Sequence, residues 1–182
     1  MEFDIKKISL SRDNNFRSIK NLIKKKICFY SKKNWKQSCN LISEGWNIDL
    51  RKDLEFMNKI EYFLKKIYKP YFKKLGIQSL QFPVNIRLVG INKNKLNKNH
   101  AYSTENLHSD VWSGAPADIY NFFLYIFVDK DGSYLDIFKV KQNIDKYSNF
   151  RGSYKDININ KRDIEYFEFK KISGNSIIFN PF

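Results

Sequence analysis

The sequence predicts an α+β fold in which N-terminal helices buttress a double-stranded β-helix, the jelly-roll of cupin-like proteins. Up to residue 76 the apolar residues recur at helical spacing, whereas from residue 77 onward they alternate or gather in short runs bounded by turn residues. Short strands at this density after an all-helical first part are typical of layered α+β domains. No repeat or linker divides the chain, so we expect one domain over 1–182, with helical support at 1–76 and the β-helix core at 77–182.

Two helices are expected in the first part. Ser11 is the predicted cap of the first, whose apolar residues fall at helical spacing: Phe16, Ile19, Leu22, Ile23 and Ile27. Asp49 is the predicted cap of a second, longer helix, with these residues inward: Leu50, Leu54, Met57, Ile60, Leu64 and Ile67. Pro70 is expected to end or kink this helix, and Gly76 suits the turn that follows. The mixed segment 29–46 allows no assignment.

Six strands are expected in the second part. Val84, Ile86 and Leu88 alternate along the first, at 84–88, with Pro83 at its start where a missing N–H is tolerated. The others are expected at 107–112, 119–128, 134–140, 164–172 and 176–179.

The formal charge of +14 raises the question of nucleic-acid binding. Almost all of the basic residues are lysines spread through the whole chain, which favours a basic, solvated surface over a nucleic-acid interface. No apolar run approaches the length of a membrane helix, and the first residues lack the pattern of a signal peptide. Cys28 and Cys39 form no paired motif and are expected to be reduced thiols. We therefore expect a cytoplasmic protein without membrane or nucleic-acid partners.

His108 and Asp110 form the most distinctive motif in the chain. They lie two residues apart beside the apolar run 119–128, and side chains at this spacing on a strand project from the same face. A histidine and an aspartate so placed can supply two ligands of the facial triad that holds non-haem Fe(II). A His-x-Asp triplet also arises easily by chance, so the spacing alone leaves metal binding open.

Three segments carry a family resemblance: residues 83–87 (PVNIR), 107–114 (LHSDVWSG) and 173–182 (SGNSIIFNPF). Together they resemble the Fe(II)- and 2-oxoglutarate-dependent oxygenases, in particular the phytanoyl-CoA-dioxygenase-like enzymes of bacterial surface-carbohydrate gene clusters. The resemblance covers about residues 81–182. It implies that His108 and Asp110 bind Fe(II), that 2-oxoglutarate is the co-substrate, and that a small, carbohydrate-related molecule is hydroxylated. Hydroxylation is expected over halogenation because Asp110 occupies the carboxylate position.

Asn121, Tyr125 and Arg87 are candidates for binding the co-substrate. Asn121 and Tyr125 lie four residues apart on one expected strand and so share a face, while Arg87 stands among apolar neighbours and can pair with a carboxylate. The alternative is structural: an amide and a phenol at strand edges, and an arginine on a sheet surface.

In the family that the chain resembles, the segment at 173–182 leads into a distal histidine and an arginine, and this sequence stops before both. The resemblance therefore implies that C-terminal strands are missing. Three explanations remain open: a truncated oxygenase, a split enzyme completed by a second chain, or a degenerate relative that binds carbohydrate or a polyanion without catalysis.

Overall fold

The structure, a computed structural model, describes residues 5–79, 81, 83–89, 110, 119–129, 135–148 and 159–180. The described residues belong to two compact units. One unit, which we call the helical unit, contains the described residues of 10–89 together with 126–129. The other, which we call the sheet unit, contains residues 5–9, 110, 119–125, 135–148 and 159–180.

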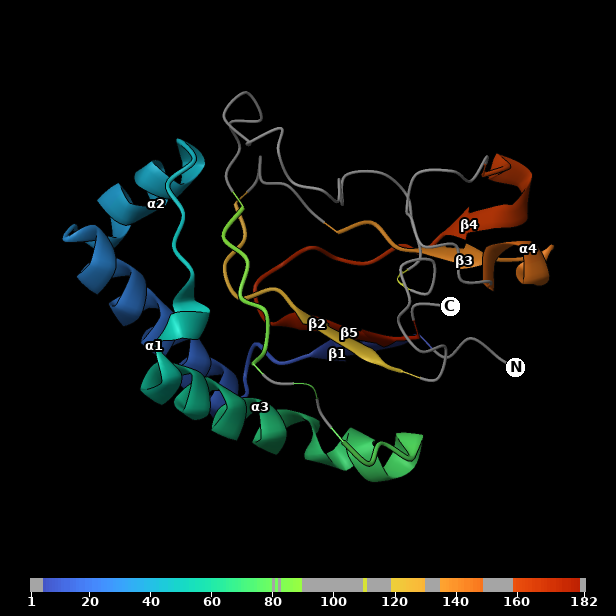
Figure 1. Cartoon of the computed structure of the whole chain (residues 1–182), viewed down its shortest axis with the longest axis horizontal. Coiled ribbons are helices and arrows are strands. Elements are labelled where there is room, and N and C mark those ends of the chain that lie inside the picture. Colours follow the sequence, from blue (N-terminus) through green and yellow to red (C-terminus); the bar gives the residue numbers. More distant parts are fainter. Residues whose placement is uncertain are drawn as a thin grey trace. The chain divides into compact units, whose positions relative to one another are not determined.

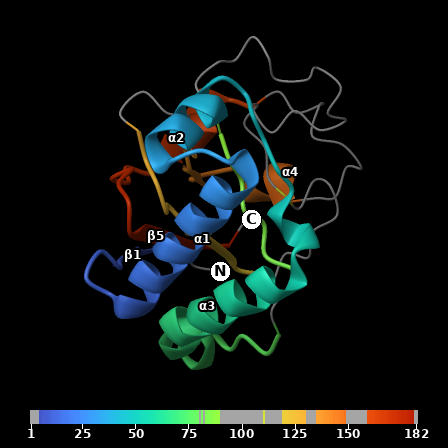
Figure 2. The same ribbon diagram turned by 90° about the vertical axis from the view of Figure 1, so that its left-hand side faces the viewer.

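Three α-helices build the helical unit: α1 (Asn14–Ser31), α2 (Trp35–Ser43) and α3 (Leu54–Leu75), with the short 3-10 helix η1 (Leu50–Lys52) before α3. Figures 1 and 2 show α1 running beside α3, with α2 following the C-terminal end of α1. Of the five apolar residues that the helical spacing predicts for α1, Leu22 is half-buried and the other four are buried: Phe16, Ile19, Ile23 and Ile27. Helix α3 contributes Phe56, Met57, Ile60, Ile67 and Tyr68 to the buried set. The two expected helices are therefore confirmed.

The caps of these helices differ from the expected ones. Asp13, not Ser11, caps α1, and its side chain accepts a hydrogen bond from the Phe16 N–H at 3.0 Å. Asp49 caps only η1, whereas Asp53 caps α3 by accepting from the Phe56 N–H at 3.0 Å. Leu54 is consequently the first residue of α3 and is 73% exposed, so its predicted inward position is wrong.

Helix α3 runs through Pro70 and continues to Leu75, so Pro70 does not end the helix, and the predicted alternative of a kink there stays a prediction. Gly76 ends it with a left-handed conformation (φ 68°), as predicted, and the Ile77 N–H donates to the Phe72 carbonyl at 2.9 Å. Residues 83–89 follow without a strand, contrary to prediction. Val84, Ile86 and Leu88 are nevertheless half-buried while the residues between them are exposed, so the predicted alternation is present without strand pairing.

The sheet unit contains a three-stranded antiparallel sheet in the order β1-β5-β2, formed by β1 (Lys6–Ser9), β5 (Asn175–Phe179) and β2 (Asn121–Leu124) (Figure 1). Lys6 pairs with Ile178 and Phe122 pairs with the same residue from the other side. The apolar residues Ile177 and Ile178 of the central strand are buried, as is Ser176, whose hydroxyl donates to the Phe123 carbonyl at 2.9 Å. The strands expected at 119–128 and 176–179 are thus present, the first of them shorter than expected.

A second, two-stranded antiparallel sheet pairs β3 (Phe138–Val140) with β4 (Ile164–Tyr166). The short helix α4 (Ile144–Ser148) follows β3, and the 3-10 helix η4 (Lys161–Asp163) precedes β4. Both strands lie inside the ranges expected at 134–140 and 164–172. The fold is therefore a mixture of helices and small antiparallel sheets, as the α+β prediction requires. In the part of the chain that the structure describes, no helix has the length and apolarity needed to cross a membrane.

Candidate functional site

The start of β2 brings together two of the residues singled out in the sequence. The side-chain amide of Asn121 donates from Nδ2 to Oδ2 of Asp110 at 2.9 Å, and both residues are half-buried. Asn121 is held in place by the sheet, because it pairs in register with Phe179 of β5. An ionised carboxylate can only accept hydrogen bonds, so the Asn121 side chain must face Asp110 with its amide nitrogen and not with its oxygen. The result is a carboxylate whose orientation is set by a neighbouring strand.

His108 lies outside the described residues, so its predicted pairing with Asp110 stays a prediction. Among the residues that are described, no three or more histidine, cysteine, aspartate or glutamate side chains gather in a way that could hold a metal ion. Asp110 is the member of the predicted pair that the structure describes.

Tyr125 follows β2 and is buried, with 7% of its surface exposed. Its hydroxyl accepts from the Leu135 N–H at 3.2 Å and lies 3.3 Å from the Leu135 carbonyl, to which it donates. Its ring packs at its edge against Phe123 and stacks on Phe169, with centroids 4.9 and 5.7 Å away. Burial raises the pKa of the phenol. These contacts match the structural alternative for Tyr125, and a role in binding 2-oxoglutarate stays a prediction.

Arg87 belongs to the helical unit, in the segment 83–89, and its side chain is exposed. Asn121 and Tyr125 belong to the sheet unit. Of the predicted site residues, the structure brings Asp110 and Asn121 together. The pairing of Arg87 with a carboxylate stays a prediction.

A buried polar cluster surrounds Asp163, which the sequence reading did not single out. Asp163 is 1% exposed and accepts three side-chain hydrogen bonds: from Tyr147 at 2.6 Å, Gln142 at 3.0 Å and Asn143 at 3.1 Å. These bonds, the Tyr147 hydroxyl first, hold the pKa of the carboxyl below its ordinary value. Spacing alone could not have found this cluster, because its donors come from α4 and from the loop before it.

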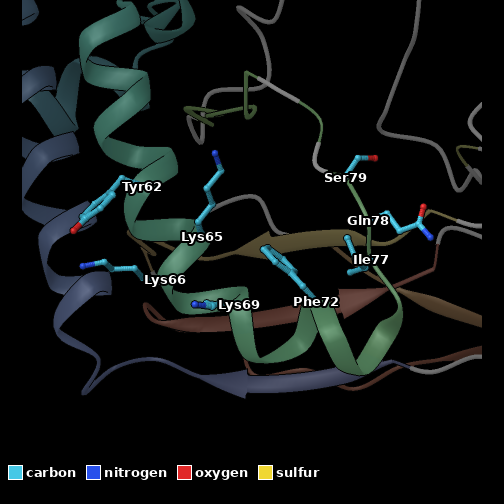
Figure 3. Close-up of a pocket in the computed structure, with 8 residues that line it drawn as sticks. All are labelled: Tyr62, Lys65, Lys66, Lys69, Phe72, Ile77, Gln78 and Ser79. Carbon is cyan, nitrogen blue, oxygen red and sulfur yellow. The ribbon is translucent and has the colours of Figure 1, made fainter.

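A pocket of about 570 Å³ lies on the exposed face of α3, within the helical unit (Figure 3). The sequence analysis predicted no site on this face. The face carries three lysines between two aromatic residues: Tyr62, Lys65, Lys66, Lys69 and Phe72. Their spacing of three, four and seven residues along a helix is the signal that could have revealed them.

Comparison of the chain with protein-family models, with curated proteins and with solved structures found no match in any of the three.

Proposed function

We propose that the chain is a non-haem Fe(II)- and 2-oxoglutarate-dependent oxygenase that hydroxylates a small, carbohydrate-related molecule. The observation that carries the proposal is the hydrogen bond from Asn121 to Asp110, because it joins the predicted metal ligand to the first residue of the strand predicted to hold the co-substrate. The fold we propose is a jelly-roll, which the two small antiparallel sheets support without defining it.

The chemistry of the donor set fits Fe(II). An aspartate and a histidine are ligands of the facial triad, and carboxylates that bind metals are themselves commonly held by hydrogen bonds. Iron(II) bound there with 2-oxoglutarate would supply the oxidation of a substrate C–H bond.

The protein's own residues would position these groups. Asp110 and His108 would hold the metal, and the Asn121 amide would keep the Asp110 carboxylate from rotating when the metal binds. The third ligand of the triad would come from a residue other than His108 and Asp110. With these two ligands alone, metal affinity would be modest, because affinity depends on the number of ligands and on a preformed site.

An anaerobic titration with Co(II) in place of Fe(II), in the presence of 2-oxoglutarate, tests the proposal through the visible absorption of the bound metal. We expect the wild-type chain to bind Co(II), and His108→Ala and Asp110→Asn each to abolish the absorption. Asn121→Leu should weaken binding about 10- to 100-fold, because it removes the hydrogen bond that orients the carboxylate. Succinate formation with Fe(II) should fall in the same order.

Glu168→Gln is the matched control, since Glu168 is an exposed carboxylate of the same unit and its loss changes the charge equally. If Asp110→Asn bound Co(II) as well as Glu168→Gln, the assignment of Asp110 as a ligand would be wrong. Circular dichroism of each variant separates loss of the ligand from loss of the fold.

A further inference from the structure

The positive charge of the chain is concentrated in the segment that builds the helical unit. Of the 33 basic residues of the chain, 18 lie in residues 10–89, but only six of its 19 acidic residues do, so this segment has a formal charge of +12. The remaining residues carry 15 basic and 13 acidic side chains, a formal charge of +2. The lysines are thus spread along the chain, whereas the acidic residues that would balance them are not. Such an asymmetry is typical of proteins that bind an anionic surface.

Two apolar side chains are exposed where α1 meets α3. Phe29, in the last turn of α1, is 71% exposed, and Leu54, the first residue of α3, is 73% exposed. Among the described residues these are the two most exposed of the large apolar side chains. Packing within the helical unit therefore leaves both of them in contact with water.

An ion pair between α1 and α3 places these two side chains at one junction. The helices run in opposite directions (Figures 1 and 2), and Lys26 near the end of α1 pairs with Asp53, the cap of α3. Phe29 follows Lys26 by three residues, and the Lys26 Nζ lies 5.5 Å from its ring centroid. Leu54 follows Asp53 directly. Exposed apolar side chains that gather in this way mark an interaction site.

Exposed lysines surround the same junction. Lys25 lies four residues before Phe29 and therefore on the same face of α1. Lys33 follows the end of α1, and Lys52 lies just before α3. Each of these three lysines is exposed, and within the described part of the chain none of them forms an ion pair. The acidic residues of 49–55 are already paired with other cations: Asp49 with Arg51, Asp53 with Lys26, and Glu55 with Lys59.

We propose that this junction is a docking surface for an anionic lipid bilayer, with Phe29 and Leu54 entering the interface and the surrounding lysines facing the headgroups. Apolar side chains gain by moving from water to the boundary of the acyl chains, and each lysine near an anionic leaflet adds attraction. A nucleic acid can stack a base on Phe29 but not on the aliphatic Leu54, so the bilayer is the better match.

The proposal departs from the expectation that the chain has no membrane partner, because that expectation was drawn from the lysines without the acidic residues. It is independent of the oxygenase proposal, and its residues all belong to the helical unit.

Co-sedimentation of the whole chain with vesicles of equal amounts of phosphatidylserine and phosphatidylcholine tests the proposal. At low salt we expect these vesicles to bind about tenfold or more tightly than vesicles of phosphatidylcholine alone. The double variant Phe29→Gln, Leu54→Gln should bind them about tenfold more weakly than wild type. It should remain folded, because both side chains are exposed and glutamine favours helices. The triple variant Lys25→Gln, Lys33→Gln, Lys52→Gln should also lose about tenfold.

The control variants remove the same kinds of exposed side chain from the sheet unit. They are Tyr166→Gln with Ile172→Gln for the apolar pair, and Lys141→Gln, Lys161→Gln with Lys170→Gln for the lysines. Both controls should keep vesicle affinity within about twofold of wild type. Equal losses in the two triple variants would mean attraction by net charge alone and would overturn the site.

A direct measurement requires no variant. In bicelles of the same two lipids, a spin-labelled lipid should broaden the amide NMR signals of Phe29 and Leu54 more than those of Tyr166 and Ile172. No binding to the mixed vesicles would overturn the proposal. Suppose instead that Phe29→Gln, Leu54→Gln bound the vesicles as well as wild type and that duplex DNA displaced the protein from them. The surface would then bind nucleic acid, and the proposal would be wrong.

Discussion

Asp163 shows how a charged side chain is accommodated in the interior of the sheet unit. A buried carboxylate is costly unless hydrogen bonds replace its hydration, and three donors do so here. Asn143 adopts a left-handed backbone conformation (φ 56°), which asparagine tolerates, while its side chain donates to Asp163. The Gln142 side chain and the Lys141 N–H, which donates to the Asp163 carbonyl at 2.8 Å, tie the end of β3 to the end of η4. The cluster therefore links β3 to β4 and stabilises their pairing.

Removing the Tyr147 hydroxyl should destabilise the polar cluster around Asp163. Tyr147→Phe keeps the buried ring but deprives Asp163 of its shortest hydrogen bond, so we expect a loss of about 1 to 3 kcal/mol in the free energy of unfolding. Urea denaturation at pH 7 measures it. Tyr166→Phe is the control, since the Tyr166 hydroxyl is exposed and its contact with Asp136 is long at 3.4 Å. Equal losses in both variants would contradict the assignment.

The pH dependence of stability should report on the same carboxylate. Because the pKa of Asp163 is lowered in the folded protein, its ionised form contributes stability that is fully present above the ordinary value of 3.8. This contribution is lost as the pH falls from there through the lower pKa of the folded state. In Asp163→Asn, stability should therefore fall less steeply than in wild type as the pH is lowered. Thermal unfolding between pH 5 and about pH 2 measures this difference.

Helix ends show where sequence patterns stop being sufficient. Ser11, Asp13, Asp49 and Asp53 are all good caps, and the pattern could not choose among them. Asp53 also pairs with Lys26 of α1 and accepts from Tyr30 at 3.4 Å, contacts that exist only once α1 packs against α3. The choice of cap is thus made by tertiary structure.

Helix α2 was missed for a different reason. It buries only Ser38 fully. Its apolar residues Trp35, Cys39 and Ile42 fall at helical spacing but are only half-buried, and a helix of nine residues is too short to make that pattern a clear signal. Its signal is instead the capping box formed by Asn34 and Gln37, whose side chains and backbone N–H groups bond reciprocally at 3.0 and 3.3 Å. The spacing Asn-x-x-Gln stands in the sequence and would have marked the start of α2.

Gly76 allows a test of the turn that ends α3. An alanine Cβ there would have no atom within 4 Å, so Gly76→Ala should be destabilising through backbone strain alone, by about 1 kcal/mol. Gly76→Asn should cost less, because asparagine tolerates this conformation better. Chemical denaturation of the three proteins gives the order, and an alanine variant as stable as wild type would contradict the left-handed conformation.

At the scale of the whole molecule, the fold class followed from the change in the spacing of apolar residues near residue 77. Buried residues recur about every three to four positions in a helix and every second position in a strand. The order of strands in the sheet did not follow, because pairing between distant segments leaves no local signal. Strand β1 (Lys6–Ser9) has one apolar residue and became a strand only by pairing with β5. At the candidate site, Asp110 and Asn121 were both named from the sequence, yet their direct contact is a property of the folded sheet unit.

Removing β1 should expose one edge of β5 and loosen the sheet. A chain starting at Leu10 should show faster hydrogen exchange at the amides of Ile177 and Ile178, because β5 would then be paired on one side only. A chain starting at Ile5 is the control, as it keeps β1 entire. The helical circular dichroism signal should persist in both, since the buried residues of α1 and α3 belong to the helical unit. Unchanged exchange in the shorter chain would contradict the pairing.

The pairing of β1 with β5 also bears on synthesis of the protein in the cell. The ribosome makes β1 before all the helices and β5 after all of them, so the nascent chain carries β1 without its partner while the helices are synthesised. Helices α1 to α3 depend on contacts nearer in sequence and can form while translation proceeds. The three-stranded sheet cannot form until β5 leaves the ribosome, because both β1 and β2 pair with β5, and until then their backbone groups lack these partners.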